Sequence, residues 1–196
     1  TNADWDTPLD WLTLFPEMWR VLKPMGVICL YASMPFTYEL LRYHKPKYHY
    51  TWLKDNTTGF LTARKQPLRC MEEVFIYYER NGTTYNPQMI GDTEYQRRNL
   101  CHSGGSGYYK SSEGTKVSQK KGHHKGRYPT TLLKSGIRND KTGISRTDDH
   151  IDFFIKTYTN EEDTVLDMTC HNKTVGNRCL ALNRNYIGCD LVPWTS

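Results

Sequence analysis

The chain has 196 residues and a formal net charge of +5, with 26 Lys and Arg against 21 Asp and Glu. Its length suits one α/β domain with a sizeable core and leaves little room for two full domains. Because it has no secretory signal and no apolar run long enough to span a bilayer, we expect neither a secreted nor a membrane protein. Six cysteines without a C-x-x-C pair favour a reduced, cytoplasmic protein over a disulfide scaffold.

The first third of the chain predicts alternating helices and strands. Apolar residues recur with helical spacing over residues 8–23, and Pro24 and Gly26 end that helix. Residues 27–31 form a short apolar run, typical of a strand buried on both faces. A turn over 33–36 follows, and a second helix begins near Thr37.

Two further strands are predicted at residues 48–53 and 73–78. The polar loop between them, residues 56–69, carries the basic residues Arg64, Lys65 and Arg69. From Gly82 to Lys134 the composition shifts to Asn, Gly, Ser, Lys, Arg and His with little periodicity. A stretch of this length is too long for a routine connection, so we expect either a functional loop region or a partly disordered one.

The last third predicts a helix at residues 149–157 and then a strand–loop–helix–strand unit. The first strand of this unit ends in Asp167 and the second in Asp190. Acids at strand ends are the layout with which open α/β sheets hold a nucleoside cofactor, although such acids also simply cap helices. The loop normally contains glycines that let the backbone approach the ligand, but here it contains His171, Asn172 and Lys173.

Taken together, these pieces resemble the β-class DNA amino-methyltransferases of the small phage and prophage type. Those enzymes use S-adenosylmethionine to make N6-methyladenine or N4-methylcytosine. The resemblance covers nearly the whole chain and keeps the permuted order of the class, with the catalytic region first and the cofactor region last. The matching pieces are residues 5–6, 22–26, 30–36, 52–64, 67–69, Glu72, 84–88, 127–130 and 155–167.

The resemblance implies an α/β fold with a mostly parallel sheet flanked by helices, the Rossmann-like methyltransferase fold. It implies one domain over residues 1–196, with 80–145 as a loop-rich target-recognition insertion. The implied reaction is methyl transfer to an exocyclic amine of a flipped base in double-stranded DNA, adenine N6 rather than cytosine N4. The alternative is a catalytically inactive relative that binds DNA or a partner. A homodimer remains open, and a restriction-modification role fits the family.

The resemblance also assigns residues to sites. Asp190 would bind the ribose hydroxyls of S-adenosylmethionine, Asp167 would lie near its amino-acid end, and Thr169 is a weaker candidate. Seven basic residues would contact DNA, although a solvated flexible loop is the alternative for the second group: Arg64, Lys65 and Arg69, and Lys120, Lys121, Lys125 and Arg127. In the family, a D-P-P-Y or S-P-P-Y tetrapeptide stands shortly before the segment that Trp5 and Asp6 match. It is absent from this sequence, through truncation or real loss, so the catalytic residues stay unknown.

Two segments depart from the family pattern. The glycine-rich cofactor loop is matched by His171, Asn172 and Lys173, where Lys173 either binds an anion at a helix N-terminus or reflects drift. The H-P-T-x-K-P segment, which helps close the cofactor pocket, is matched by residues 145–150, and only Thr147 is retained. A metal site at Cys101, His102, His123 and His124 is not expected, because the spacing matches no zinc arrangement.

Overall fold

The computed structural model describes residues 9–79, 82–96, 123–140, 143–171 and 173–190. The chain divides into two compact units. The first comprises Thr1–Pro87 and Thr130–Ser196, and the second is Gln88–Pro129. Within the described residues, no helix is long and apolar enough to cross a membrane.

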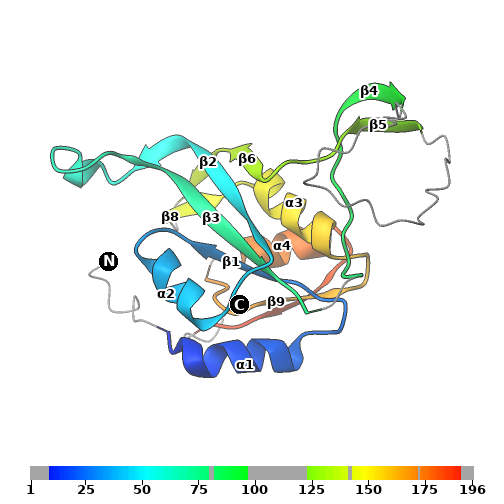
Figure 1. Ribbon diagram of the computed structural model, residues 1–196, viewed down its shortest axis with the longest axis horizontal. Helices are drawn as coiled ribbons and strands as arrows, with labels where there is room; N and C mark the ends of the chain where they lie inside the picture. The colour runs from blue at the N-terminus through cyan, green and yellow to red at the C-terminus, as the bar shows by residue number, and fades with distance from the viewer. Residues whose placement is uncertain (1–8, 80–81, 97–122, 141–142, 172, 191–196) are drawn as a thin grey trace, which may run out of the picture. The chain divides into compact units, whose positions relative to one another are not determined.

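The first unit alternates helices and strands along the chain (Figure 1). Its N-terminal elements are α1 (Trp11–Val21), β1 (Ile28–Ala32), α2 (Phe36–Tyr43), β2 (Tyr48–Thr58), a short 3₁₀ helix (Phe60–Thr62) and β3 (Arg69–Tyr77). Its C-terminal elements are β6 (Leu132–Ser135), β7 (Ile137–Asp140), β8 (Gly143–Arg146), α3 (Asp148–Tyr158), β9 (Thr164–Asp167), α4 (Thr174–Ala181) and β10 (Asn185–Gly188). The predicted helices and strands of this unit are confirmed, with boundaries that move by a few residues.

The main sheet has the strand order β1-β3-β2-β6. β3 is antiparallel to both β1 and β2, whereas β6 is parallel to β2. The α/β class is therefore confirmed, but the expected mostly parallel sheet is wrong for this part of the molecule, because the sheet is mixed. The reason is the hairpin: a short connection between β2 and β3 makes them antiparallel neighbours, and β3 then lies between β1 and β2.

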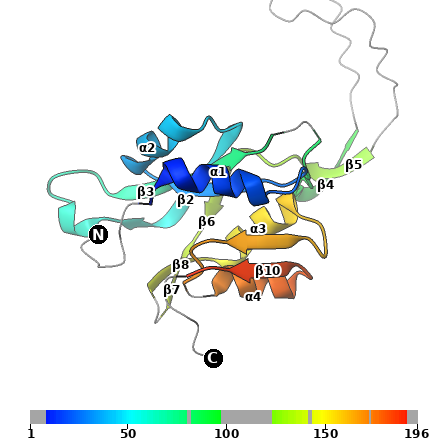
Figure 2. The same cartoon turned by 90° about the horizontal axis from the view of Figure 1, so that it is seen from below.

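Helices cover both faces of the main sheet (Figure 2). Phe75 and Tyr77 of β3 pack in one cluster with Phe15 of α1 and Leu40 of α2. Val74 and Ile76 of β3 point to the opposite face, where they pack in a cluster with residues of α3 such as Phe154. Consecutive residues of a strand alternate between faces, so β3 is buried on both sides and joins the two halves of the core.

A third cluster connects α3 to the C-terminal elements. Ile151 and Ile155 of α3 pack with Cys179 of α4, beside Tyr186 of β10. β9 and β10 pair in parallel as a separate two-stranded sheet. An ion pair between Asp152 of α3 and Arg178 of α4 fixes the two helices to each other, with two hydrogen bonds of 2.6 Å each.

The second unit is built on a pair of antiparallel strands, β4 (Ile90–Gln96) and β5 (His123–Arg127). Gly126 adopts a φ of +82°, and a Cβ there would lie 2.7 Å from the carbonyl oxygen of Gly91, so glycine is required at this position. The region 82–134 was expected to consist of loops. It contains β4, β5 and β6, because strand pairing with a distant partner does not need a strongly periodic sequence.

Candidate functional site

Two acids lie at one edge of the β9–β10 sheet. Asp167 is the last residue of β9 and is the partner of Gly188, the last residue of β10. Asp190 follows two residues later, just beyond the strand in which it was expected. Asp167 is half-buried and Asp190 is exposed. Since the two strands are parallel, their carboxyl ends meet at the same edge, as the sequence predicted.

The loop after Asp167 is held to the end of β10 by backbone hydrogen bonds. The Cys189 N–H donates to the carbonyl oxygen of Asp167 at 2.8 Å, and the Cys170 N–H donates to the carbonyl oxygen of Cys189 at 3.0 Å. Lys173 ends the loop as the N-cap of α4 with a φ of +57° and a ψ of 9°. This left-handed conformation favours glycine, so the backbone keeps a glycine-like shape without the glycine.

Two of the residues that replace the glycines have solvent-exposed side chains. His171 and Lys173 are both exposed, and Asn172 lies outside the described residues. Thr169 is exposed too, and its backbone N–H donates to Asp167 Oδ1 at 3.2 Å. Thr169 therefore supports the strand-end carboxylate through its main chain, while a role for its hydroxyl in binding a cofactor stays a prediction.

Tyr186 is a residue of this site that sequence reasoning missed. Its hydroxyl donates to Asp167 Oδ2 at 3.3 Å. Burial and the neighbouring Asp167 carboxylate raise the pKa of Tyr186, so the hydroxyl stays protonated as a donor. A Cβ at Gly176 would lie 2.7 Å from Tyr186 Cε1, and one at Gly188 would lie 2.8 Å from its hydroxyl. In the sequence, Gly176 precedes Tyr186 and Gly188 follows it. These two glycines were the only sequence signal that the ring of Tyr186 packs closely against the backbone.

A buried network occupies the segment that matches H-P-T-x-K-P. His150 is 3% exposed and stacks near Trp52, with ring centroids 4.2 Å apart. One ring nitrogen, Nδ1, is hydrogen-bonded to Ser135 Oγ and the other, Nε2, to the Tyr31 hydroxyl, both at 3.0 Å. Burial, and then the charge of Arg146, lower the pKa of His150 to about 3. The imidazole is therefore neutral and bridges β6 to β1.

Arg146 extends this network. Its guanidinium carbon lies 3.6 Å from the centroid of the Tyr31 ring, in cation–π geometry. Its Nη2 lies 3.8 Å from Oε2 of Glu72, and Glu72 also pairs with the buried Lys54. Sequence reasoning treated residues 145–150 as a changed cofactor motif. In the structure His150 is buried, and the partly exposed Arg146 packs over the Tyr31 ring beside it.

The predicted DNA-binding residues lie in different parts of the molecule. Arg64, Lys65 and Arg69 are all exposed on the hairpin between β2 and β3. Lys125 and Arg127 are exposed on β5 of the second unit, where Lys125 pairs with Asp92 at 3.2 Å. Lys120 and Lys121 lie outside the described residues. The described cations thus belong to both units of the chain.

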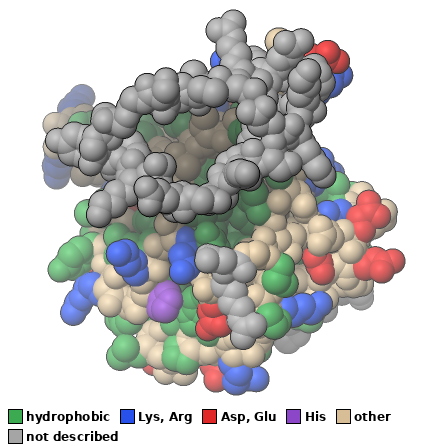
Figure 3. All heavy atoms as spheres, turned by 45° about the vertical axis from the view of Figure 1, so that its right-hand side comes forward, with side chains coloured by type: hydrophobic (Ala, Val, Ile, Leu, Met, Phe, Trp, Pro, Cys, Tyr) green, Lys and Arg blue, Asp and Glu red, His purple; other side chains and the backbone are tan. Residues whose placement is uncertain are grey.

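The face of the molecule in Figure 3 carries both basic and acidic side chains. The net charge of +5 therefore does not mark a binding face by itself. Among the described residues, no group of three or more His, Cys, Asp and Glu side chains could hold a metal ion. Cys101 and His102, which were considered for such a site, are outside that part of the chain.

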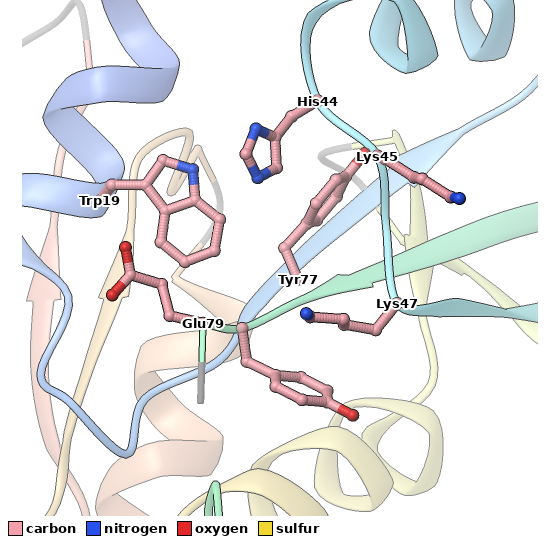
Figure 4. A pocket seen from close by; sticks show the side chains of 7 residues that line it. Trp19, His44, Lys45, Lys47, Tyr77 and Glu79 are labelled. Carbon is pink, nitrogen blue, oxygen red and sulfur yellow. The ribbon is translucent and has the colours of Figure 1, made fainter. Parts of the chain in front are cut away.

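A pocket of about 370 Å³ lies elsewhere, beside the end of β3 (Figure 4). It is formed around Tyr77, which pairs with Ile28 where β1 begins. Its lining residues are Trp19, His44, Lys45, Lys47, Tyr77, Tyr78 and Glu79. Since none of the predicted site residues lines this pocket, it is not the predicted cofactor site.

Comparison with known proteins identifies the family. The family model N6_N4_Mtase, described as DNA methylase, matches residues 3–193. No curated protein matches the chain. Among solved structures, the chain is similar to the M1.HpyAVI–SAM complex, with 16% identity over 95% of this chain and 80% of that chain and a TM-score of 0.59.

Two more solved structures share the fold. A second structure of M1.HpyAVI has 16% identity over 94% of this chain and 76% of that chain, with a TM-score of 0.56. The PvuII cytosine-N4-specific DNA methyltransferase has 14% identity over 94% of this chain and 66% of that chain, with a TM-score of 0.63. The methyltransferase fold expected from the sequence is confirmed, and the chain belongs to the N6/N4 DNA methylase family.

Proposed function

We propose that this chain binds S-adenosylmethionine and acts in the transfer of its methyl group to an exocyclic amine of a DNA base, adenine N6 rather than cytosine N4. The observation that carries the proposal is the placement of Asp167 and Asp190. Both lie at the carboxyl ends of two parallel strands, in a chain that the family model matches over residues 3–193. Open α/β sheets bind their ligands at that edge.

The donor chemistry of this edge fits the cofactor. The exposed carboxylate of Asp190 suits the two ribose hydroxyls, because one carboxylate accepts both hydrogen bonds. Asp167, oriented by Tyr186 and the Thr169 N–H, suits the positively charged amino-acid end. The side chains of His171 and Lys173 are exposed, and the left-handed backbone at Lys173 is a conformation that glycine adopts readily.

When bound, the cofactor supplies an activated methyl group. The role of the residues described above is to bind and orient it, so that a flipped base and the methyl donor meet in line. No residue of the 196 is assigned as catalytic, because the D-P-P-Y or S-P-P-Y tetrapeptide is not among them. The preference for adenine rests on the pattern around Trp5 and Asp6, which resembles the D-P-P-Y branch of the family.

The proposed partner is double-stranded DNA in the cytoplasm. Arg64, Lys65 and Arg69 on the exposed hairpin would bind phosphates, and the second unit, with Lys120, Lys121, Lys125 and Arg127, would form the target-recognition region. Changing Lys120, Lys121 and Lys125 to alanine should weaken DNA binding and lower the salt slope by roughly 0.9 for each lost contact. The control is Lys23→Ala with Lys47→Ala, because both lysines are exposed and lie outside the proposed DNA-binding segments. An unchanged slope would remove the segment from the interface.

A catalytically inactive module is the alternative. It is favoured by the loss of glycines at His171 and Lys173, by the burial of His150, and by the packing of Arg146 on the Tyr31 ring. Calorimetric titration with S-adenosylmethionine separates the two. We expect saturable binding that Asp190→Ala weakens at least tenfold, while Asp163→Ala, a change at an acid outside the site, leaves it unchanged. No heat at millimolar ligand with a folded sample would favour the inactive module.

A further inference from the structure

The hairpin between β2 and β3 has an apolar tip that the proposed DNA binding does not by itself explain. Phe60 is 76% exposed and Leu61 is 88% exposed. Large apolar side chains are normally buried, and two adjacent ones at this exposure form an unfavourable contact with water. Figure 1 shows the hairpin extending beyond the rest of the sheet.

The tip is shaped by its own hydrogen bonds. Gly59 has a φ of +85° and precedes the 3₁₀ turn of Phe60–Thr62. Thr62 donates to the carbonyl oxygen of Gly59 through its N–H at 3.1 Å and through its hydroxyl at 3.0 Å. Gln66 Nε2 donates to Thr62 Oγ1 at 3.0 Å. These bonds are local, so the turn presents Phe60 and Leu61 outward without packing them on the body.

The charge around the tip is of one sign. Residues 56–71 contain Arg64, Lys65 and Arg69 and no Asp or Glu. All three cations are exposed. An apolar tip flanked by cations is complementary to a duplex, whose interior is a stack of apolar base faces between two rows of phosphates.

The hairpin is also long enough to reach the base stack of a duplex. Ala32, at the carboxyl end of β1, is the partner of Glu73 on β3, and the pairing of β2 with β3 continues from there to Thr58 and Arg69. At about 3.3 Å per residue, the four residues from Glu73 to Arg69 carry the arm roughly 13 Å past the end of β1. Each groove of B-DNA is roughly 8 Å deep, so an arm of this length can reach the base stack.

From these observations we propose that Phe60 and Leu61 form a wedge that enters the base stack of DNA, while Arg64, Lys65 and Arg69 hold the phosphates beside it. This inference rests on the proposed function, because base flipping opens the stack and an apolar side chain can enter an opened base step. Arginine and lysine near an exposed apolar tip also suit an anionic membrane surface. DNA is favoured here because the chain belongs to a DNA methylase family.

The test uses the whole chain and two mixed-sequence duplexes, one with a single abasic site and one intact with an internal 2-aminopurine, whose fluorescence rises when it unstacks. The wild-type chain should raise the fluorescence and bind the abasic duplex more tightly than the intact one. The double change Phe60→Ser and Leu61→Ser should abolish both effects and keep the salt slope. Arg64→Ala with Lys65→Ala should instead lower the slope. Leu12→Ser is the matched control, since Leu12 is 73% exposed on α1.

The possible failures are distinguishable. If the wild-type chain binds neither duplex, the DNA-binding part of the proposed function is wrong. If it binds both and the serine variant keeps the fluorescence rise, the wedge is wrong and DNA binding stands. If the serine change reduces sedimentation with phosphatidylserine vesicles but leaves DNA binding and fluorescence intact, the tip serves a membrane surface and the wedge is overturned. Thermal melting of each variant confirms that the fold is retained.

Discussion

The two segments that depart from the family pattern are accommodated in opposite ways. At the cofactor loop, His171 and Lys173 replace glycines, but their side chains are exposed and the backbone keeps a left-handed residue. At residues 145–150, His150 of α3 is buried against Tyr31 and Trp52, and the partly exposed Arg146 packs over the Tyr31 ring. The first departure places its side chains in solvent, whereas the second places His150 in the buried interior.

This difference predicts which changes can be reversed. A side chain that points to solvent can be replaced at little cost, while a buried polar side chain that bridges two elements cannot be removed without leaving its partners unsatisfied. Restoring the family sequence should therefore be tolerated at the loop and destabilising at the network.

The largest expected effect is at His150. His150→Ala should lower the free energy of unfolding by about 3 kcal/mol, because it leaves a cavity beside Trp52 and removes the partner of the Tyr31 and Ser135 hydroxyls. Urea denaturation measures the change. His49→Ala, at an exposed position on β2, is the control and should have little effect. Equal stability of the two variants would show that the network contributes nothing to folding.

The second prediction concerns pH. The folded-state pKa of His150, about 3, lies below the ordinary value of 6.5, so the unfolded chain takes up the proton first. The stability from the neutral imidazole is present above pH 6.5 and is lost as pH falls toward 3, by about 1.4 kcal/mol per pH unit. By pH 5 the loss should reach about 2 kcal/mol. Denaturation curves of the wild type and His150→Gln at several pH values isolate this contribution; parallel curves would contradict it.

The third prediction tests the close packing behind the cofactor loop. Gly176→Ala should cost about 1–2 kcal/mol, because the new Cβ would meet the ring of Tyr186 at 2.7 Å. It should also disturb Asp167 and weaken S-adenosylmethionine binding. In the double variant with Tyr186→Leu the penalty should shrink, since the smaller side chain makes room. A full penalty in that background would place the clash elsewhere.

The smallest effect is expected at Lys173. Lys173→Gly should raise stability by about 0.5–1 kcal/mol, because glycine adopts a φ of +57° without the steric cost that lysine has. Lys173→Ala should give no such gain. Both variants remove the lysine charge, but only glycine relieves the backbone strain, so comparing them separates the two effects. If glycine and alanine behave alike in thermal melting, the left-handed backbone is not the source of the effect.

Much of the secondary structure could be predicted because it depends on local patterns. The helical spacing of Phe15 and Met18, the apolar run of β1 and the strand that ends in Asp167 are readable within short windows. The meeting of Asp167 and Asp190 at one edge also followed, since consecutive parallel strands joined by a helix share an edge. The mixed sheet did not follow, because the strand order depends on how the hairpin inserts beside β1.

The sequence by itself determined the family, the order of elements and the two strand-end acids. These rest on residue types and on spacings along the chain. Only the tertiary structure showed that His150 bridges Tyr31 and Ser135, that Tyr186 orients Asp167, and that Phe60 and Leu61 form an exposed tip. His150 and Tyr31 are 119 residues apart, and no local pattern records which distant side chains share a buried site or which apolar ones stay in water.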